Sequence, residues 1–249
     1  MEIHIISLFP EFFQSAEIGL IGKAMQERMQ IHHHHLRDFS SRKDRRIDDR
    51  PFGGGPGMLI QAEPIYQARQ HIKEKSPDTQ FIFTDPKGTV FSQKIANELA
   101  NKTSLTFICG RYEGIDERAY EKDDLRLSLG DFVMSGGEIA ALAMIDAMSR
   151  LLPGTLGNPE SHRADSHQNH LLEHPQYTRP ALWRNKKVPD VLTSGNHQDI
   201  EKWQRLQQLG LTWQLRPDLI RQAVLTADDK LLLEQYIEDY QNVDPDTTN

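Results

Sequence analysis

Three short glycine-containing segments, each after an expected strand, are the residues best placed to bind a ligand. They are 84–88 (TDPKG), 110–114 (GRYEG) and 130–137 (GDFVMSGG). In open α/β sheets, ligands bind beyond the carboxyl ends of the strands, and glycine there lets the backbone approach a ligand closely. A tight turn would explain any one segment alone. Three together predict a single ligand crevice.

Two common nucleotide-binding motifs are not found in these segments. None matches GxGxxG after a strand, and none is a phosphate loop that ends in Gly-Lys-Ser/Thr. The sequence therefore disfavours an NTPase and an ordinary dinucleotide-binding protein.

A further segment, 49–58 (DRPFGGGPGM), is dominated by glycine and proline. Such a backbone has few side chains to bury. It predicts either a flexible surface loop or a surface that packs closely against a ligand or a second chain.

The histidines do not predict a metal site. The run 32–35 lies in an expected strand, where consecutive side chains point to opposite faces, so all four cannot bind one metal. Further along the chain, His162, His167, His170 and His174 lack a motif such as HExxH.

Charge is unevenly distributed along the chain. The net charge is −7, but residues 228–249 carry −6, which leaves about −1 for the rest. Basic residues gather in 37–50 and 179–187. Both could be solvated surface segments. Tight nonspecific binding to phosphate backbones is disfavoured, while a specific RNA contact stays open.

Composition indicates a globular protein. The 249 residues are 37% hydrophobic and 26% charged, with no run of 18 apolar residues that would predict a membrane span. The first residues do not resemble a signal peptide. The only cysteine, Cys109, is compatible with a reducing compartment. We therefore expect a cytoplasmic protein with no membrane contact.

Expected strands and helices alternate in the first part of the chain. Apolar patterns predict strands at 2–8, 31–36, 80–84, 105–109 and 125–129, and helices at 11–30, 63–75, 92–101 and 135–151. This alternation predicts the α/β class with a parallel sheet.

The pattern changes after about residue 153. A polar, aperiodic stretch is followed by expected helices, one capped by Asn196 and ended by Gly210, and two more at 217–222 and 228–240. We expect an α/β domain at 1–156, a flexible linker at 157–172 and a small helical domain at 173–249.

Several long segments together resemble the bacterial tRNA (guanine-N1)-methyltransferases of the SPOUT superfamily. They are 6–13 (ISLFPEFF), 48–58 (DDRPFGGGPGM), 109–118 (CGRYEGIDER), 130–138 (GDFVMSGGE), 145–154 (IDAMSRLLPG), 177–180 (YTRP) and 191–197 (VLTSGNH). The resemblance implies an α/β domain with a deep trefoil knot, a homodimer, S-adenosylmethionine bound in the knot, and tRNA contacted by both subunits. The implied product carries a methyl group on N1 of the guanosine directly 3′ of the anticodon.

The matching motifs also imply which positions of this chain correspond to the family's site residues. The cofactor would be lined, mainly through backbone groups, by Phe83, Thr84, Asp85, Gly110, Glu113, Gly114, Leu129, Gly130, Phe132, Met134, Gly136 and Gly137. Asp165 takes the place of the general base, and Arg150 that of a partner for the guanine. The family uses magnesium, for which the sequence shows no all-protein site.

Some positions differ from the family pattern. Residues 84–88 stand where Leu-Ser-Pro-Gln-Gly is common, Ala164 replaces an acid, His167 replaces an aromatic residue, and 173–176 (EHPQ) replaces Asp-Cys-Pro-His. Two alternatives stay open: a SPOUT enzyme that acts on ribosomal RNA, and a catalytically inactive RNA-binding SPOUT protein.

Overall fold

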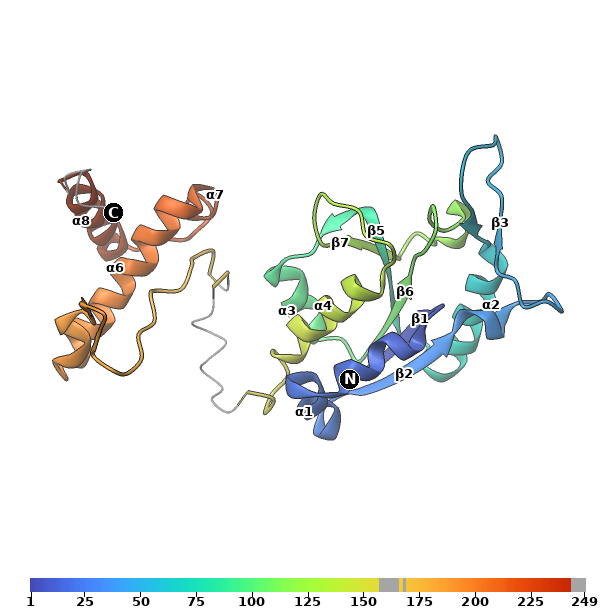
Figure 1. Cartoon of the computed structure of the whole chain (residues 1–249), viewed down its shortest axis with the longest axis horizontal. Coiled ribbons are helices and arrows are strands. Elements are labelled where there is room, and N and C mark those ends of the chain that lie inside the picture. Colours follow the sequence, from blue (N-terminus) through green and yellow to red (C-terminus); the bar gives the residue numbers. More distant parts are fainter. Residues whose placement is uncertain (157–165, 168, 243–249) are drawn as a thin grey trace. The chain divides into compact units, whose positions relative to one another are not determined.

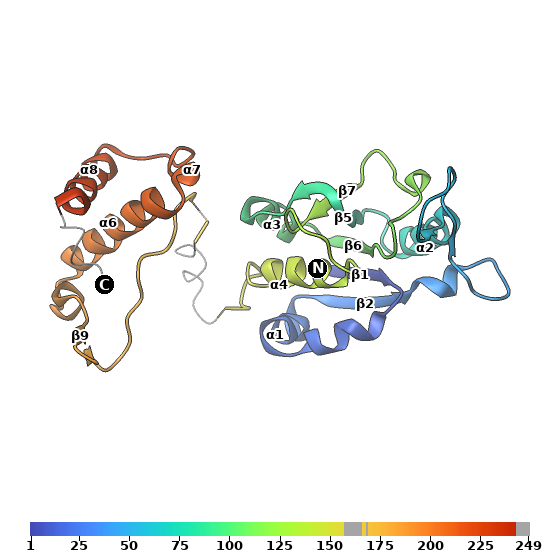
Figure 2. The same ribbon diagram turned by 45° about the horizontal axis from the view of Figure 1, so that its top comes forward.

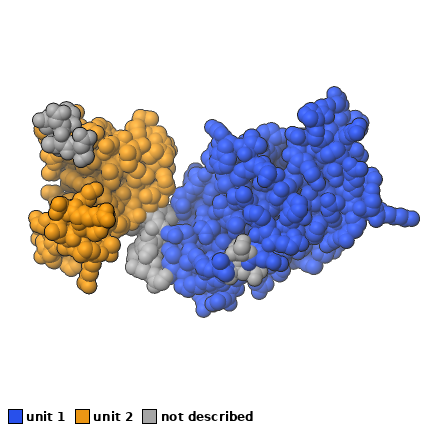
Figure 3. Space-filling view, in the orientation of Figure 1, with its two compact units in different colours: residues 1–159 blue, residues 160–249 orange. Residues whose placement is uncertain are grey.

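The chain forms two compact units, Met1–Pro159 and Glu160–Asn249, which are coloured separately in Figure 3. The computed structural model describes residues 1–156, 166–167 and 169–242. Each unit is described by itself below.

Unit 1 is built on a five-stranded sheet (Figure 1). Its strands are β1 (Glu2–Ser7), β2 (Gln30–His35), β5 (Gln80–Val90), β6 (Ser104–Cys109) and β7 (Leu125–Ser128), in the order β2-β1-β6-β5-β7. All neighbouring pairs are parallel, which confirms the predicted α/β class and sheet. Strand β6 is buried along its whole length, as expected for a central parallel strand.

Helices cover both faces of this sheet. Residues of α1 (Gly19–Glu27), α3 (Gln93–Ala100) and α4 (Glu138–Ser149) contribute to one buried apolar cluster. Helix α2 (Ala62–Lys75) contributes to a second cluster, which shares strands β1, β5 and β6 with the first. The sheet is therefore fixed by core packing from both sides.

Some predicted boundaries differ from the observed ones. The helix expected at 11–30 is divided into the 3₁₀ helix η1 (Pro10–Glu17) and α1, because Ile18 is extended and Gly19 has φ +65°. Strand β5 runs to Val90, with a shift in its pairing with β7 between Thr84 and Thr89.

The glycine-rich segment is held at its base by a small two-stranded sheet. Strands β3 (Asp48–Asp49) and β4 (Leu59–Ile60) pair antiparallel, so that residues 50–58 form the loop between them. Two short 3₁₀ helices, η2 (Leu36–Phe39) and η3 (Glu117–Ala119), complete the unit.

Unit 2 is mainly helical (Figure 2). It contains the hairpin β8 (Leu182–Trp183) and β9 (Lys186–Lys187), the 3₁₀ helix η4 (Asp190–Thr193), and helices α6 (His197–Leu215), α7 (Pro217–Ile220) and α8 (Ala227–Asn242). Asn196 caps α6 as predicted, because its side chain accepts a hydrogen bond from the Gln198 amide. No helix in the described ranges is long and apolar enough to cross a membrane.

The prediction that Gly210 ends a helix is wrong, since α6 continues to Leu215. A Cβ atom at Gly210 would lie 2.2 Å from Cδ2 of Tyr236 on α8. The absence of a side chain lets α8 pack closely on α6. Here tertiary packing outweighs the poor helix propensity of glycine.

The described end of the expected linker is bonded to α6. Leu171 is buried, and the amide of Leu172 donates a hydrogen bond of 2.8 Å to Oγ1 of Thr212. Residues 171–172 therefore belong with the helices of unit 2.

Candidate active site

A cavity of about 440 Å³ lies at the carboxyl edge of the sheet, beyond the ends of β6 and β7 and beside the irregular part of β5. Its walls are the three glycine-containing segments, so the structure brings together parts of the chain that are far apart in the sequence. The prediction that 84–88 follows a strand is wrong, because this segment lies within β5. The predicted cofactor residues that line the cavity are Thr84, Asp85, Gly110, Glu113, Gly114, Leu129, Gly130, Phe132, Met134, Gly136 and Gly137.

Phe83 is the exception among these predicted residues, because it does not line the cavity. Its side chain is fully buried in the core, and its ring centre lies 4.4 Å from that of Tyr120. Phe83 therefore supports the wall of the cavity from behind.

The loops approach one another most closely at Gly137. Its amide donates a hydrogen bond of 2.9 Å to the carbonyl of Gly110. A Cβ atom on Gly137 would lie 1.8 Å from Oγ1 of Thr84, closer than real Cβ atoms come to other heavy atoms. This position therefore requires glycine, and any larger residue would displace the cavity wall.

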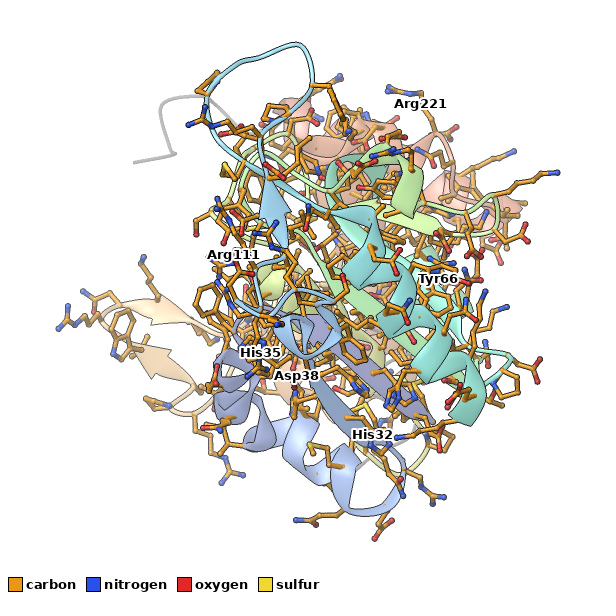
Figure 4. The ribbon with its side chains drawn as sticks, turned by 90° about the vertical axis from the view of Figure 1, so that its right-hand side faces the viewer. His32, His35, Asp38, Tyr66, Arg111 and Arg221 are labelled. Atoms are coloured by element: carbon orange, nitrogen blue, oxygen red, sulfur yellow. The ribbon has the colours of Figure 1, made fainter. Side chains whose placement is uncertain are left out.

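A buried carboxylate ties the cavity loops to the sheet. Glu138, at the start of α4, is only 1% exposed and accepts hydrogen bonds from Oγ of Ser7 at 2.7 Å and Nε of Arg111 at 3.0 Å. The Arg111 guanidinium also stacks over the ring of Phe9, at 4.5 Å from its centre. Figure 4 labels Arg111. This cluster joins the ends of β1 and β6 to the start of α4.

Neither Glu138 nor Arg111 was predicted from the sequence as a site residue, although both lie in the motifs that carry the family resemblance. An acid in the first turn of a helix is favourable by itself, so Glu138 could have been explained without a partner. Only the fold brings Ser7 and Arg111 to it. The nearby thiol of Cys109 is not a candidate nucleophile, because burial raises its pKa well above the usual value.

A second carboxylate, Asp85, faces the cavity from β5. It accepts hydrogen bonds from the Lys87 amide at 2.9 Å and from the Tyr120 hydroxyl at 3.2 Å. Burial and the neighbouring Asp85 raise the pKa of Tyr120, so its hydroxyl stays a donor. The Arg126 guanidinium covers the Tyr120 ring at 3.5 Å. A carboxylate in such a wall can accept a hydrogen bond from a ligand hydroxyl or amine.

Arg150, one of the two predicted catalytic residues, does not line this cavity. Arg150 caps the far end of α4, whereas Gly137 precedes its first residue. A helix of 12 residues rises roughly 18 Å at 1.5 Å per residue, so the two ends are well separated. Asp165 lies outside the described residues.

The described residues contain no group of three or more His, Cys, Asp or Glu side chains that could hold a metal ion. Histidines do gather on one face of the sheet, where His4 Nδ1 lies 3.1 Å from His34 Nε2 and the His4 ring stacks on that of His32. Burial, followed by the charge of neighbouring His4, lowers the pKa of His34 to about 4. Figure 4 labels His32 on β2.

Comparison with known proteins extends the sequence resemblance to most of the chain. Residues 1–222 match the family model described as tRNA (Guanine-1)-methyltransferase TrmD. A tRNA (guanine-N(1)-)-methyltransferase from Sulfurihydrogenibium sp. (strain YO3AOP1) is 47% identical over 240 residues, which cover 96% of this chain and 94% of the relative.

Two other relatives carry the same name. The protein of Clostridium botulinum (strain Loch Maree / Type A3) is 45% identical, with 95% of this chain and 98% of the relative covered. That of Syntrophotalea carbinolica (strain DSM 2380 / NBRC 103641 / GraBd1) is 46% identical, with 94% and 96% covered. Because the family model and these relatives each cover most of the chain, this chain belongs to the TrmD family of tRNA (guanine-1)-methyltransferases.

Proposed function

We propose that this chain transfers the methyl group of S-adenosylmethionine to N1 of the guanosine directly 3′ of the anticodon in tRNA. The observation that carries the proposal is the cavity at the carboxyl edge of the sheet, in a chain of a guanine-1 methyltransferase family. The relatives' names supply the tRNA and the guanine N1 atom.

The cavity fits a nucleoside-containing cofactor. Its volume of about 440 Å³ lies within the range usual for small-ligand sites. Backbone groups of 110–114 and 130–137 would hold the cofactor, and Asp85 would accept a hydrogen bond from one of its hydroxyl or amino groups. When bound, S-adenosylmethionine supplies an electrophilic methyl group.

Two side chains of the protein would act on the guanine. The proton on N1 must leave as the methyl group arrives, and the carboxylate of Asp165 would accept it. An aspartate has an ordinary pKa of ~3.9 and is a weak base towards so weak an acid, so the guanine must also be activated. Arg150 would do this by stabilising negative charge that grows on O6.

The position of Arg150 favours a homodimer. Because this residue lies at the opposite end of α4 from its own cavity, a site that uses both needs a second chain. Apolar side chains are also exposed at the rim, where Val133 is 88% and Phe132 54% exposed, and Phe52 of the glycine-rich loop is 98% exposed. A second chain that covered them would bury this apolar surface.

We further propose a trefoil knot in unit 1 and a cytoplasmic location, both from the family resemblance. In this scheme residues 1–156 bind the cofactor, 157–172 link the domains and 173–249 bind tRNA. Magnesium would be a further cofactor, as the family resemblance implies.

Transfer of a labelled methyl group tests the proposal. Purified protein should label a tRNA transcript with guanosine after the anticodon, and nuclease digestion should release N1-methylguanosine. A transcript with adenosine at this position is the matched control and should stay unlabelled. Cofactor binding without transfer to any tRNA would indicate the inactive RNA-binding alternative. Labelling of ribosomal RNA alone would indicate the alternative of a SPOUT enzyme that acts on ribosomal RNA.

A further inference from the structure

The hairpin β8–β9 of unit 2 carries side chains that the cavity does not use. Trp183 pairs directly with Lys186, and Leu182 with Lys187. The two turn residues, Arg184 and Asn185, have φ +46° and +63°. Positive φ at both positions is typical of the type I′ turn, which matches the twist of a two-residue hairpin. Figure 2 shows the hairpin, labelled at β9, beside the helices of unit 2.

The pairing determines which side chains share a face. Directly opposed residues of an antiparallel pair project to the same side, so Trp183 and Lys186 lie on one face of the hairpin. The Arg184 guanidinium lies 5.0 Å from the centre of the Trp183 ring and adds a second cation there. The Trp183 side chain is nevertheless 56% exposed.

The charges on the two faces differ. Lys187, on the opposite face, forms an ion pair with Asp190. Within residues 166–167 and 169–242, by contrast, neither Arg184 nor Lys186 forms an ion pair. The face with Trp183 therefore combines an exposed aromatic ring with two cations that have no ion-pair partner among the described residues.

The turn also retains an arginine where glycine or asparagine is usual. A left-handed φ at a residue with a long side chain is unfavourable, and strained backbone of this kind clusters at functional sites. Glycine at position 184 would give the same turn without the strain. The sequence instead keeps a cation beside the tryptophan.

We infer that the hairpin face formed by Trp183, Arg184 and Lys186 binds RNA, with the Trp183 ring stacked on an unpaired base and the two cations near the flanking phosphates. Aromatic rings between cations are a common means of binding single-stranded nucleic acid. A polyanion also matches the charge better than an apolar protein surface would. The inference rests on the proposed function, because tRNA supplies the RNA.

Binding of full-length protein to a fluorescent tRNA transcript tests the inference. Trp183→Ala should weaken binding by about 5- to 100-fold, the range for loss of one stacked base, while Trp183→Phe should retain most of the affinity. Lys186→Ala should lower the slope of log K against log salt by roughly 0.7–0.9, as for one lost phosphate contact. Lys102→Ala, which changes an exposed lysine of unit 1 outside the cavity, is the matched control and should retain the slope.

The outcomes separate this inference from the proposed function. Methyl transfer and tRNA binding are measured separately, because the inference concerns only the affinity for tRNA. Wild-type affinity in Trp183→Ala together with a wild-type salt slope in Lys186→Ala would overturn the inference and leave the hairpin to another kind of partner. If wild-type protein binds tRNA without methylating it, and the hairpin variants weaken that binding, the proposed function fails and the inference stands.

Discussion

The cavity of unit 1 and the hairpin of unit 2 carry their binding residues on structural elements that differ in burial. The cavity loops follow buried parallel strands, and a buried Glu138 ties them together. The hairpin consists of two exposed residue pairs joined by a two-residue turn. A small change in the cavity must therefore disturb several elements, whereas a change on the hairpin removes only the side chain itself.

This difference separates two kinds of binding. A preorganised cavity keeps its shape without the ligand, so its geometry determines which cofactor fits. An exposed aromatic residue with cations contributes affinity for a polyanion and leaves the interior unchanged. Variants in the two units should accordingly affect different measurements.

The largest effect is expected at Gly137. Gly137→Trp should abolish binding of S-adenosylmethionine and S-adenosylhomocysteine, because even a Cβ atom there meets Thr84 at 1.8 Å. Calorimetric titration measures this. The same change at Gly195 of unit 2 is the control. A Cβ there would meet nothing within 4 Å, and the strain that φ +78° imposes on a larger residue is confined to unit 2, so cofactor affinity should stay intact. Cofactor binding by Gly137→Trp would remove the cavity assignment.

Asp165→Asn should slow methyl transfer by roughly 10²–10⁴-fold, as is usual for loss of a general base. Cofactor affinity should stay near the wild-type value, because Asp165 lies outside the three cavity loops. Single-turnover measurements with saturating tRNA test the chemical step. A near-normal rate would show that another group accepts the proton.

Mixed dimers test whether two chains share a site. Gly137→Trp lacks a cofactor site and Asp165→Asn lacks the base, so a mixed dimer would assemble one complete site of two. With random pairing, co-expression should restore about a quarter of wild-type activity in a twofold-symmetric dimer. Isolated mixed dimers with no more activity than either parent would contradict the shared site.

A smaller effect is expected where Glu138 holds the cavity loops. Glu138→Gln leaves Arg111 without its counter-charge. Because Arg111 is partly exposed, we expect a loss of about 2–4 kcal/mol of unfolding free energy, less than for a fully buried pair. Cofactor affinity should fall too. Glu117→Gln, whose exposed carboxylate pairs with Arg126, is the matched control and should change stability little in denaturant unfolding.

The sequence predicted the five strands of the main sheet and the loops 110–114 and 130–137 because both depend on local patterns. The two-residue strands β3 and β4 were not predicted, and the expected loop 84–88 lies inside β5. Apolar runs identify buried strands, and parallel strands bring the loops after them to one edge. The Glu138–Arg111–Ser7 cluster could not be predicted, since its members come from three distant segments that only the folded sheet brings together. The position of Phe83 behind the wall also depends on packing.

The prediction that Gly210 ends a helix failed for a different reason, because a local sequence rule was outweighed by a contact with a distant residue. A glycine after a helical pattern usually marks its end, and nothing nearby in the sequence identifies Tyr236 as the reason for it. The contact is made by a residue of a later helix. Gly210 is therefore a packing position inside α6, and the helix ends instead at Leu215, two residues before Pro217.

Gly210→Ala tests this packing and should disturb unit 2 alone. The added methyl group meets the Tyr236 ring, so we expect a loss of about 1–3 kcal/mol, typical of overpacking. Cofactor binding by unit 1 should be unchanged. The double variant with Tyr236→Ala should cost less than the sum of the single changes, and strict additivity in thermal unfolding would contradict the contact.

The smallest effect is expected at His34 on β2 of unit 1, which does not line the cavity. Burial and the charges of His4, His71, His32 and Lys75 lower the pKa of His34 from 6.5 to about 4. In the unfolded chain this imidazole binds its proton near pH 6.5, so between about pH 6.5 and 4 the unfolded state holds more protons. The free energy of unfolding is therefore highest above this window and falls as the pH falls through it.

Because His34 is only partly buried, we expect the free energy of unfolding to be about 1 kcal/mol lower at pH 5 than at pH 7.5. His34→Gln removes the titrating group, and denaturant unfolding at both values should show a pH dependence smaller by that amount. Parallel profiles for the two proteins would mean that the His34 environment does not disfavour its charged form.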